Sequence, residues 1–207
     1  MLITGLEPQK RNKNRVNLYI DGSYYCPLSL ETVSKHRIKI GDEIDKDELD
    51  KATVDSENSS CFSYGLKYVS RKLCTKKQVS DYLLKKGFLE NSVNFALDKL
   101  IEYNYINDAE FTRAYVNYSG ESKGMLKIKY DLINKGVDRG TVEEEIESIA
   151  NIQNDVCKKV SEKYMLKKEH DIKTKAALYR YLASKGFTQE AITAAVKDVF
   201  SGGDYNE

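Results

Sequence analysis

Apolar residues recur with helical spacing in three similar stretches of this sequence. The stretches read LLKKGFLENSVNFALDKL from Leu83, LINKGVDRGTVEEEIESI from Leu132 and LASKGFTQEAITAAVKDV from Leu182. Each stretch contains a Lys-Gly pair, and the glycines stand 49 and 50 residues apart, at Gly87, Gly136 and Gly186. A pattern that returns at such a regular interval indicates a chain built from internal repeats.

The residues before each glycine predict a helix of about three turns. Apolar side chains stand eight and four residues before the glycine, on one helical face, as Val79 and Leu83, Ile128 and Leu132, and Leu178 and Leu182. The predicted N-caps, twelve residues before it, are Thr75, Gly124 and Thr174. The glycine then takes the C′ position, where a left-handed backbone closes the helix without a Cβ clash.

The residues after each glycine predict a second helix. Phe88, Val137 and Phe187 follow the glycines directly, and we expect them to pack back on the helix just ended. An apolar stripe then marks the second helix in each copy, formed by Val93, Leu97 and Leu100, by Val142, Ile146 and Ile149, and by Ile192, Val196 and Val199. The lysine before each glycine could be a repeated phosphate contact, but we favour a cation facing the helix dipole at Lys86, Lys135 and Lys185.

A further helix precedes each pair. Its predicted inward stripes are Phe62, Leu66 and Val69, then Phe111, Tyr115 and Tyr118, and finally Val156, Val160 and Tyr164. Asn107 with Glu110 predicts an N-cap at the start of the second of these helices. In the third copy the charged run KKEHDIKTK predicts a longer connection. The repeat is therefore three helices in roughly 50 residues, and such units bury their apolar faces by stacking on their neighbours.

The first 55 residues have a different pattern. Val16, Leu18 and Ile20 alternate with other residues, Asp21-Gly22 is typical of a two-residue hairpin turn, and residues 24–28 can return as the partner strand. Residues 2–6 predict a third strand, residues 30–36 a short helix, and Asp45 with Glu48 the start of a longer one.

These patterns predict a mainly α fold. Tandem three-helix repeats form an elongated, curved array, preceded by a small N-terminal segment that contains a β-hairpin. The predicted divisions are an N-terminal segment 1–55, repeats at 56–105, 106–150 and 151–201, and a tail 202–207.

Composition narrows the class of protein. The chain has 207 residues, of which 41% are hydrophobic and 31% charged. Its N-terminus lacks the apolar core of a signal peptide and no apolar run approaches membrane-spanning length, so we expect a cytoplasmic protein without membrane contact. The four cysteines lack disulfide or metal-ligand spacing and predict reduced, partly buried thiols. A net charge of +1 means that any basic surface must arise from folding.

Catalytic and cofactor motifs are missing from the sequence. There is no phosphate-binding glycine loop and no G-x-S-x-G motif. His36 and His170 have no metal-ligand or catalytic spacing and predict surface histidines. The acidic run 143–147 predicts a solvated helix face, and the 15 tyrosines do not interleave with basic residues as in a single-strand stacking platform. We therefore expect no enzyme, no cofactor and no metal.

Three segments resemble the RecX family of bacterial recombination regulators. The run GLKYVSRKLCTKKQVSDYLLKKGF (65–88) has the family's Ser-Arg pair, Thr cap and Lys-Gly-Phe stop, and YINDAEFTRAYV (105–116) is similar to its most recognisable motif. The run KGMLKIKYDLINKGV (123–137) follows in the same order. Together these segments contain 51 of the 207 residues, whereas the N-terminal segment lies in a part where such proteins differ.

The resemblance implies a fold of tandem three-helix units and a partner, the RecA filament on single-stranded DNA. It implies inhibition of RecA's ATP hydrolysis, strand exchange and co-protease activity, and it leaves direct contact with single- or double-stranded DNA open. We expect a monomer. The basic residues that fall inside the matched motifs and could bind the partner are Arg71, Lys72, Lys76, Lys77, Arg113, Lys127 and Lys129.

Two alternatives stay open at this point. Three-helix units resemble helix-turn-helix modules, so the chain could be a freestanding DNA-binding protein, although its near-neutral charge argues against that. It could also be a helical-repeat scaffold for an unrelated protein.

Overall fold

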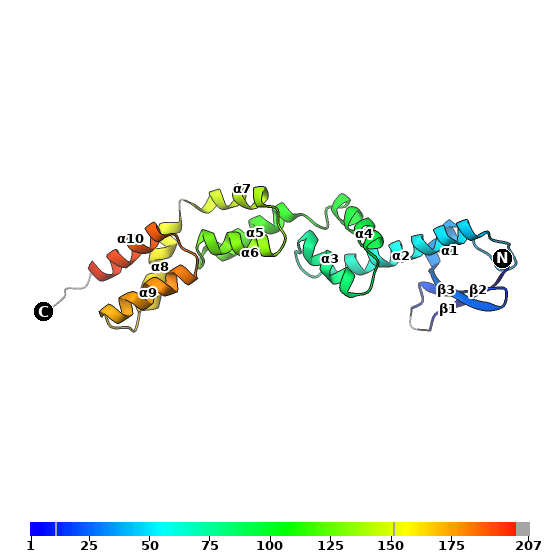
Figure 1. Ribbon diagram of the computed structural model, residues 1–207, viewed down its shortest axis with the longest axis horizontal. Coiled ribbons are helices and arrows are strands. Elements are labelled where there is room, and N and C mark those ends of the chain that lie inside the picture. The colour runs from blue at the N-terminus through cyan, green and yellow to red at the C-terminus, as the bar shows by residue number, and fades with distance from the viewer. Residues whose placement is uncertain (11, 151, 202–207) are drawn as a thin grey trace. The chain divides into compact units, whose positions relative to one another are not determined.

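The structure, a computed structural model, describes residues 1–10, 12–150 and 152–201. The chain divides into two compact units. The first contains Met1–Cys74 and Gln78–Ile106, and the second contains Thr75–Lys77 and Asn107–Glu207. Figure 1 shows the elements of both units.

A three-stranded antiparallel sheet opens the first unit, in the order β1 (Ile3–Pro8), β2 (Arg15–Ile20), β3 (Ser23–Ser29). Asp21 and Gly22 connect β2 to β3 with φ values of 50° and 81°, which confirms the predicted hairpin turn. The alternating residues Val16, Leu18 and Ile20 are all buried. They pack with Leu28 of β3 in one core that also contains Leu49 of the following helix.

Helices α1 (Leu30–Lys35) and α2 (Lys46–Val69) follow the sheet. The Asp45 carboxylate accepts the N–H of Glu48 at 2.7 Å, so the predicted N-cap of α2 is confirmed. α2 is 24 residues long and serves both the sheet and the first repeat. The predicted division between residues 55 and 56 falls inside this helix and stays a prediction, as do the other divisions.

Each repeat contains three helices, as predicted (Figure 1). The C-terminal part of α2 is joined by α3 (Lys76–Lys85) and α4 (Glu90–Glu102). The second repeat is α5 (Asp108–Gly120), α6 (Met125–Asn134) and α7 (Arg139–Ala150), and the third is α8 (Gln153–Met165), α9 (Ile172–Ser184) and α10 (Gln189–Ser201). The predicted curvature of the array stays a prediction.

The same turn ends the middle helix of every repeat. In the first, the N–H of Phe88 donates to the Leu83 carbonyl at 3.4 Å and that of Gly87 to the Leu84 carbonyl at 2.9 Å, which is a Schellman motif. Equivalent bonds end α6 and α9. The φ values of 89°, 85° and 81° at Gly87, Gly136 and Gly186 confirm the predicted left-handed glycines.

The predicted apolar stripes of the second and third helices form the cores of the repeats. The six residues before the glycines have 0% exposure: Val79, Leu83, Ile128, Leu132, Leu178 and Leu182. The stripes of α4, α7 and α10 are buried as well, except that Val199 is half-buried and Phe200 takes the deeper position.

The predicted stripes of the first helices are confirmed at all positions but Tyr118. Val156 is buried, and the other seven are partly buried against the cores of their repeats: Phe62, Leu66, Val69, Phe111, Tyr115, Val160 and Tyr164. Tyr118 is 85% exposed, whereas the fully buried positions hold small side chains, such as Cys61, Thr112, Cys157 and Ser161. Small residues let the neighbouring helix approach closely. A Cβ on Gly65, for example, would lie 2.8 Å from Leu100 Cδ1. A pattern of large apolar residues therefore located this face but missed the small residues at its most buried positions.

The predicted N-cap at Thr174 is also wrong. The N-cap of α9 is Asp171, three residues earlier, and its carboxylate accepts the N–H of Thr174 at 2.6 Å. The predicted long connection is correspondingly shorter, because the last residues of KKEHDIKTK are helical. The N-terminus of α9 is therefore capped by Asp171, the residue directly before the helix.

In the second unit, middle-helix N-termini rest on the turn of the next repeat. The N–H groups of Gly124 and Leu126 donate to the carbonyls of Lys185 and Gly186 at 2.9 and 3.1 Å, and that of Met125 donates to Gln153 Oε1 at 2.9 Å. These bonds satisfy N–H groups that the first turn of α6 cannot pair within the helix.

The residues Thr75–Lys77, which belong to this same unit, show the arrangement again. Thr75 Oγ1 donates to the Lys135 carbonyl at 2.7 Å, and the Lys76 N–H donates to Asp108 Oδ1 at 2.9 Å. Asp108 and Gln153 are each the first residue of their repeat's first helix. A Lys-Gly turn and a polar side chain therefore form a helix-capping surface, which we call the acceptor face of a repeat.

Candidate functional site

Four of the predicted partner-binding residues present free charges. Arg71, Lys72, Lys76 and Lys77 are all exposed, in the turn after α2 and in the first turn of α3. None of the four belongs to an ion pair within the part of the chain that the structure describes. Their charges are therefore available to an anionic partner.

The other three predicted residues are paired with carboxylates of the second unit. Arg113 Nη1 lies 3.2 Å from Glu145 Oε1, and Lys129 Nζ forms an ion pair with Glu143. Lys127 Nζ lies 3.4 Å from Asp131 Oδ1. The acidic run of α7, predicted as a solvated face, thus supplies counter-charges to α5 and α6.

Clusters of tyrosine and lysine side chains occur in the first and third repeats. Tyr68 and Tyr82 are stacked, with ring centroids 4.2 Å apart, and Lys72 and Lys86 lie over these rings, each 5.6 Å from a centroid. In the third repeat Tyr164 and Tyr181 are stacked at 4.6 Å with Lys168 and Lys185 over them. We call these the Tyr–Lys clusters.

The Tyr–Lys clusters were not predicted from the sequence, because folding brings their members together. Their signal is a tyrosine four residues before a lysine, which occurs at residues 68–72, 82–86, 164–168 and 181–185. The lysine that precedes each repeat glycine lies over a tyrosine ring in all three repeats, at Lys86, Lys135 and Lys185. This contact is a cation–π interaction at the end of each middle helix, and the helix-dipole role of these lysines stays a prediction.

The second repeat replaces a tyrosine of the cluster by an acid. Asp131 stands five residues before Gly136, where the other repeats have Tyr82 and Tyr181. Asp131 Oδ2 accepts hydrogen bonds from Lys123 Nζ at 2.8 Å and from the Tyr115 hydroxyl at 2.9 Å. Partial burial acts to raise the pKa of Asp131, but these two hydrogen bonds, together with the charge of Lys123 and the contact with Lys127, hold the pKa below its ordinary value.

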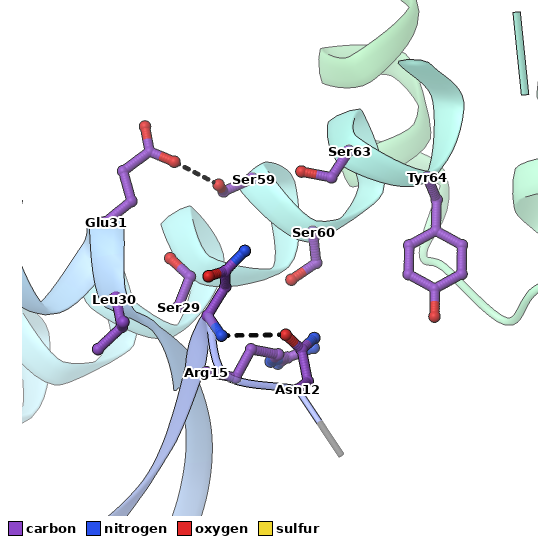
Figure 2. Close-up of a pocket in the computed structure, with 10 residues that line it drawn as sticks. Asn12, Arg15, Ser29, Leu30, Glu31, Ser59, Ser60, Ser63 and Tyr64 are labelled. Carbon is purple, nitrogen blue, oxygen red and sulfur yellow. Dashed lines mark hydrogen bonds between the residues drawn. The ribbon is translucent and has the colours of Figure 1, made fainter. Parts of the chain in front are cut away.

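A polar pocket of about 330 Å³ lies between the sheet and α2. Figure 2 shows Ser59, Ser60 and Ser63 of α2 near Asn12 and Arg15. The Ser59 hydroxyl donates to Glu31 Oε2 at 2.7 Å. Arg15 Nη2 donates to the Pro27 carbonyl, whereas Arg15 Nε is a buried donor for which the described residues supply no acceptor.

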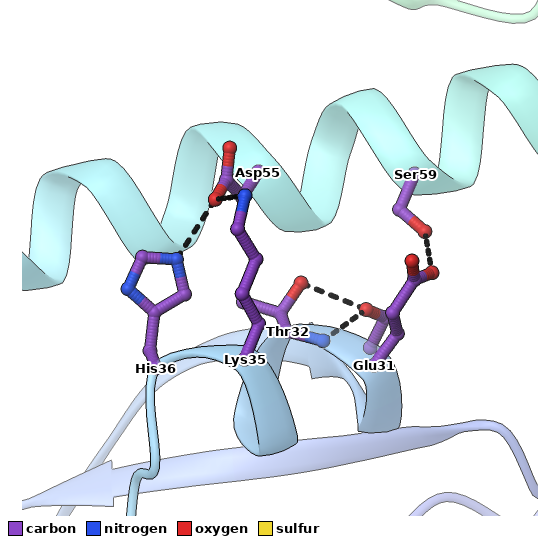
Figure 3. A network of polar contacts seen from close by, with 7 residues as sticks. Glu31, Thr32, Lys35, His36, Asp55 and Ser59 are labelled. Carbon is purple, nitrogen blue, oxygen red and sulfur yellow. Dashed lines mark hydrogen bonds and ion pairs between the residues drawn. The ribbon is translucent and has the colours of Figure 1, made fainter.

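His36 differs from the predicted surface histidine. Its side chain is 15% exposed, and Nε2 lies 2.8 Å from Asp55 Oδ2, which also pairs with Lys35 Nζ at 2.6 Å (Figure 3). Burial acts to raise the pKa of Asp55, and the hydrogen bonds from Lys35 and His36 lower it below its ordinary value. These contacts join α1 and its C-cap residue His36 to α2, so they have a structural role.

The cysteines are free thiols, as predicted. Burial raises the pKa of Cys61 to about 12 and that of Cys157 to about 11, so neither is an effective nucleophile near neutral pH. In the described part of the chain, no group of three His, Cys, Asp or Glu side chains is placed to hold a metal ion. The described helices include none that is long and apolar enough to cross a membrane.

Sequence comparison identifies related proteins along nearly the whole chain. Residues 1–45 match the N-terminal domain of regulatory protein RecX, and residues 61–100 and 107–145 match the first and second RecX three-helix domains. Regulatory protein RecX of Clostridium tetani is 36% identical over 208 residues, covering 97% of this chain and 96% of that protein. The Clostridium beijerinckii protein of the same name is 34% identical, covering 96% of each.

Solved structures show the same fold. A crystal structure of regulatory protein RecX covers 98% of this chain and 99% of that chain, with a TM-score of 0.70 at 22% identity. The crystal structure of RecX from Lactobacillus salivarius covers 71% of this chain and 98% of that chain, with a TM-score of 0.63 at 25% identity. With the sequence matches over three domains, this likeness shows that the chain belongs to the RecX family of regulatory proteins.

Proposed function

We propose that this chain regulates the RecA recombinase. In this proposal it binds the RecA filament on single-stranded DNA and suppresses ATP hydrolysis, strand exchange and co-protease activity. Membership of the RecX family over nearly the full length is the observation that supports it most. The chain acts by binding and not by catalysis.

The exposed cations support an anionic partner surface. Arg71, Lys72, Lys76 and Lys77 carry charges that are not neutralised within the described residues, so they contribute most to attraction at long range. Arg113, Lys127 and Lys129 contribute less, because each would have to exchange a carboxylate of its own unit for the partner. Repetition lets several modest contacts add up on a polymer of identical protomers.

The direct test is an ATPase assay of RecA on single-stranded DNA, with and without the chain. The expected result is suppression of RecA's rate and no ATP hydrolysis by the chain alone. An unchanged RecA rate at several-fold excess of the chain would contradict the proposal.

A charge reversal tests which cations bind. Arg71→Glu combined with Lys72→Glu should weaken filament binding, and the loss should be larger at low salt because exposed charges are screened. The matched control reverses Lys46 and Lys51, two exposed lysines of α2 outside the proposed surface, with the same change in net charge. Equal losses in both variants would show that only net charge matters.

The Tyr–Lys clusters favour a second candidate, direct contact with single-stranded nucleic acid. Aromatic rings beside lysines are typical of sites on which bases stack and phosphates bind. The test measures affinity for a single-stranded oligonucleotide without RecA across a salt series. An affinity that depends on salt and that falls in Tyr82→Ala and Tyr181→Ala would support a freestanding DNA-binding protein. If the affinity did not depend on salt, such a protein would be excluded.

A further inference from the structure

The acceptor face of the first repeat is uncovered, unlike those of the other two repeats. A Cβ built on Gly186 would lie 2.3 Å from the Lys127 backbone nitrogen, and one on Gly136 would lie 2.4 Å from Lys77 Cβ. A Cβ built on Gly87 would meet nothing within 4 Å. In the described part of the chain, the carbonyls of Lys86 and Gly87 accept no hydrogen bond.

In the first repeat, Ser59 takes the sequence position that Asp108 has in the second repeat. Asp108, which caps the Lys76 N–H, stands 28 residues before Gly136, and Ser59 stands 28 residues before Gly87. The hydroxyl of Ser59 is bonded to the Glu31 carboxylate (Figure 2), so an acidic acceptor occupies this position as well. Carbonyls and a carboxylate are the groups that complement the positive N-terminal end of a helix.

The polar pocket extends this face within the first unit. Tyr64 lines the pocket, and its ring packs edge-on against Phe88, the residue after Gly87, with centroids 5.4 Å apart. Ser63 also lines the pocket, one turn of α2 beyond Ser59 and Ser60. Arg15, whose buried Nε lacks an acceptor among the described residues, lines the same pocket.

We propose that the open acceptor face of the first repeat, formed by the Lys86–Gly87 turn, Ser59 with Glu31 and the polar pocket, binds the N-terminus of an α-helix of the partner protein. The residue at the N-cap of that helix is small. The helices that rest on the two occupied faces have a small residue at this N-cap position, Thr75 or Gly124. A Cβ on Gly124 would lie 2.1 Å from the Gly186 carbonyl carbon. The partner helix would therefore rest on the first repeat in the same way as the N-termini of the chain's own helices rest on the acceptor faces of the second unit.

This inference rests on the proposed function only for the identity of the partner. Its test therefore has two independent arms, one for the acceptor face and one for its occupant. The first arm titrates the ¹⁵N-labelled full chain with an acetylated helical peptide of residues 122–135, which contains the α6 N-terminus. The expected result is a shift of the amide signals of Ser63, Gly87 and Phe88. No shift at about 1 mM peptide, a concentration that detects even millimolar binding, would overturn the acceptor face.

Ser63→Trp fills the pocket with a bulky side chain at an exposed position of α2, and Val54→Trp is the matched control on the same helix. Because the chain has no tryptophan, fluorescence of both variants reports whether each new side chain lies in a folded environment. Ser63→Trp should abolish the peptide-induced shifts, whereas Val54→Trp should keep them. Shifts that survive Ser63→Trp would overturn the assignment.

The second arm measures affinity for the RecA filament on single-stranded DNA. We expect Ser63→Trp to lower affinity by about tenfold or more and Val54→Trp by less than about twofold. If the parent chain does not bind the filament, the proposed function fails, while the peptide titration still decides on the acceptor face. Peptide binding with an unaffected filament affinity in Ser63→Trp would overturn the filament as its occupant.

Discussion

The Lys-Gly turns at Gly87 and Gly186 have the same local structure and different surroundings. Both glycines are left-handed, with φ values of 89° and 81°, and both turns form the same pair of backbone hydrogen bonds. Gly186 lies against the N-terminus of α6, whereas Gly87 faces open space. Glycine is therefore required at Gly87 only because of the backbone conformation. At Gly186 it is also required because a Cβ would clash with the backbone of α6.

Core substitutions should give the largest effects and should not distinguish the two turns. Leu83→Ala, Leu132→Ala and Leu182→Ala each remove a side chain of 0% exposure and should each lower the free energy of unfolding by roughly 2–5 kcal/mol. Hydrogen exchange of the surrounding amides measures this in each repeat separately. If one variant were as stable as the parent, the equivalence of the three positions would be wrong.

Glycine substitutions should separate the turns. Gly87→Ala adds only backbone strain and should cost about 1–2 kcal/mol. Gly186→Ala adds the same strain and also a clash with the Lys127 backbone, at about 1–3 kcal/mol more for the overpacking. Chemical denaturation monitored by hydrogen exchange compares the two. Equal costs at both positions would mean that α6 does not cover Gly186 in solution.

Much of the fold could be predicted from the sequence because it depends on local rules. Helical periodicity located Val79 and Leu83 in the core, and the need for a positive φ located the turn at Gly87. Prediction failed where a longer-range contact decided the structure. Small buried residues such as Cys61 carry no apolar signal, and Asp171 caps α9 with a side chain that the repeat alignment assigned to the connection.

The candidate site was less accessible to sequence reasoning than the fold. The motifs indicated which cations to consider, but they did not show that Lys129 pairs with Glu143 while Lys72 lies over Tyr68 without an acid. Whether a basic side chain pairs with an acid depends on which helix faces pack together, and only the tertiary structure shows this. The acceptor face was missed for the same reason, because the Gly87 and Gly186 turns differ only in what lies against them.

Removing the polar cap of α6 should have a moderate effect that is confined to the covered turn. Gln153→Ala deletes the Oε1 acceptor of the Met125 N–H and should cost about 1 kcal/mol, which is typical of a lost helix cap. The exposed neighbour Asn154→Ala serves as the control. Hydrogen exchange should become faster for the first amides of α6 and unchanged for those around Gly87. Faster exchange at both turns would contradict a local cap.

The smallest expected effect concerns pH and the one repeat that has an acid in place of the tyrosine. Burial acts to raise the pKa of Asp131, but the hydrogen bonds from Lys123 and Tyr115, with the charge of Lys123 and the contact with Lys127, lower it from 3.8 in the folded chain. Stability from this group is therefore fully present above the unfolded pKa and is lost as the pH falls through the folded pKa. Because Lys123 and Asp131 are partly exposed, with side chains at 31% and 18%, solvent screening keeps the effect below about 1 kcal/mol.

Asp131→Asn tests this, since an amide in the same place does not titrate. Between pH 7 and pH 3 the parent should lose hydrogen-exchange protection in α5 and α6 to a greater extent than the variant, after correction for the intrinsic exchange rate at each pH. The amides around Tyr82 provide the internal control, because the equivalent position there holds a tyrosine in place of a carboxylic acid. They should respond identically in parent and variant. If the amides of α5 and α6 also responded identically in parent and variant, the hydrogen bonds of Asp131 would contribute nothing to stability. Tyrosine and aspartate would then be equivalent at this position of the repeat.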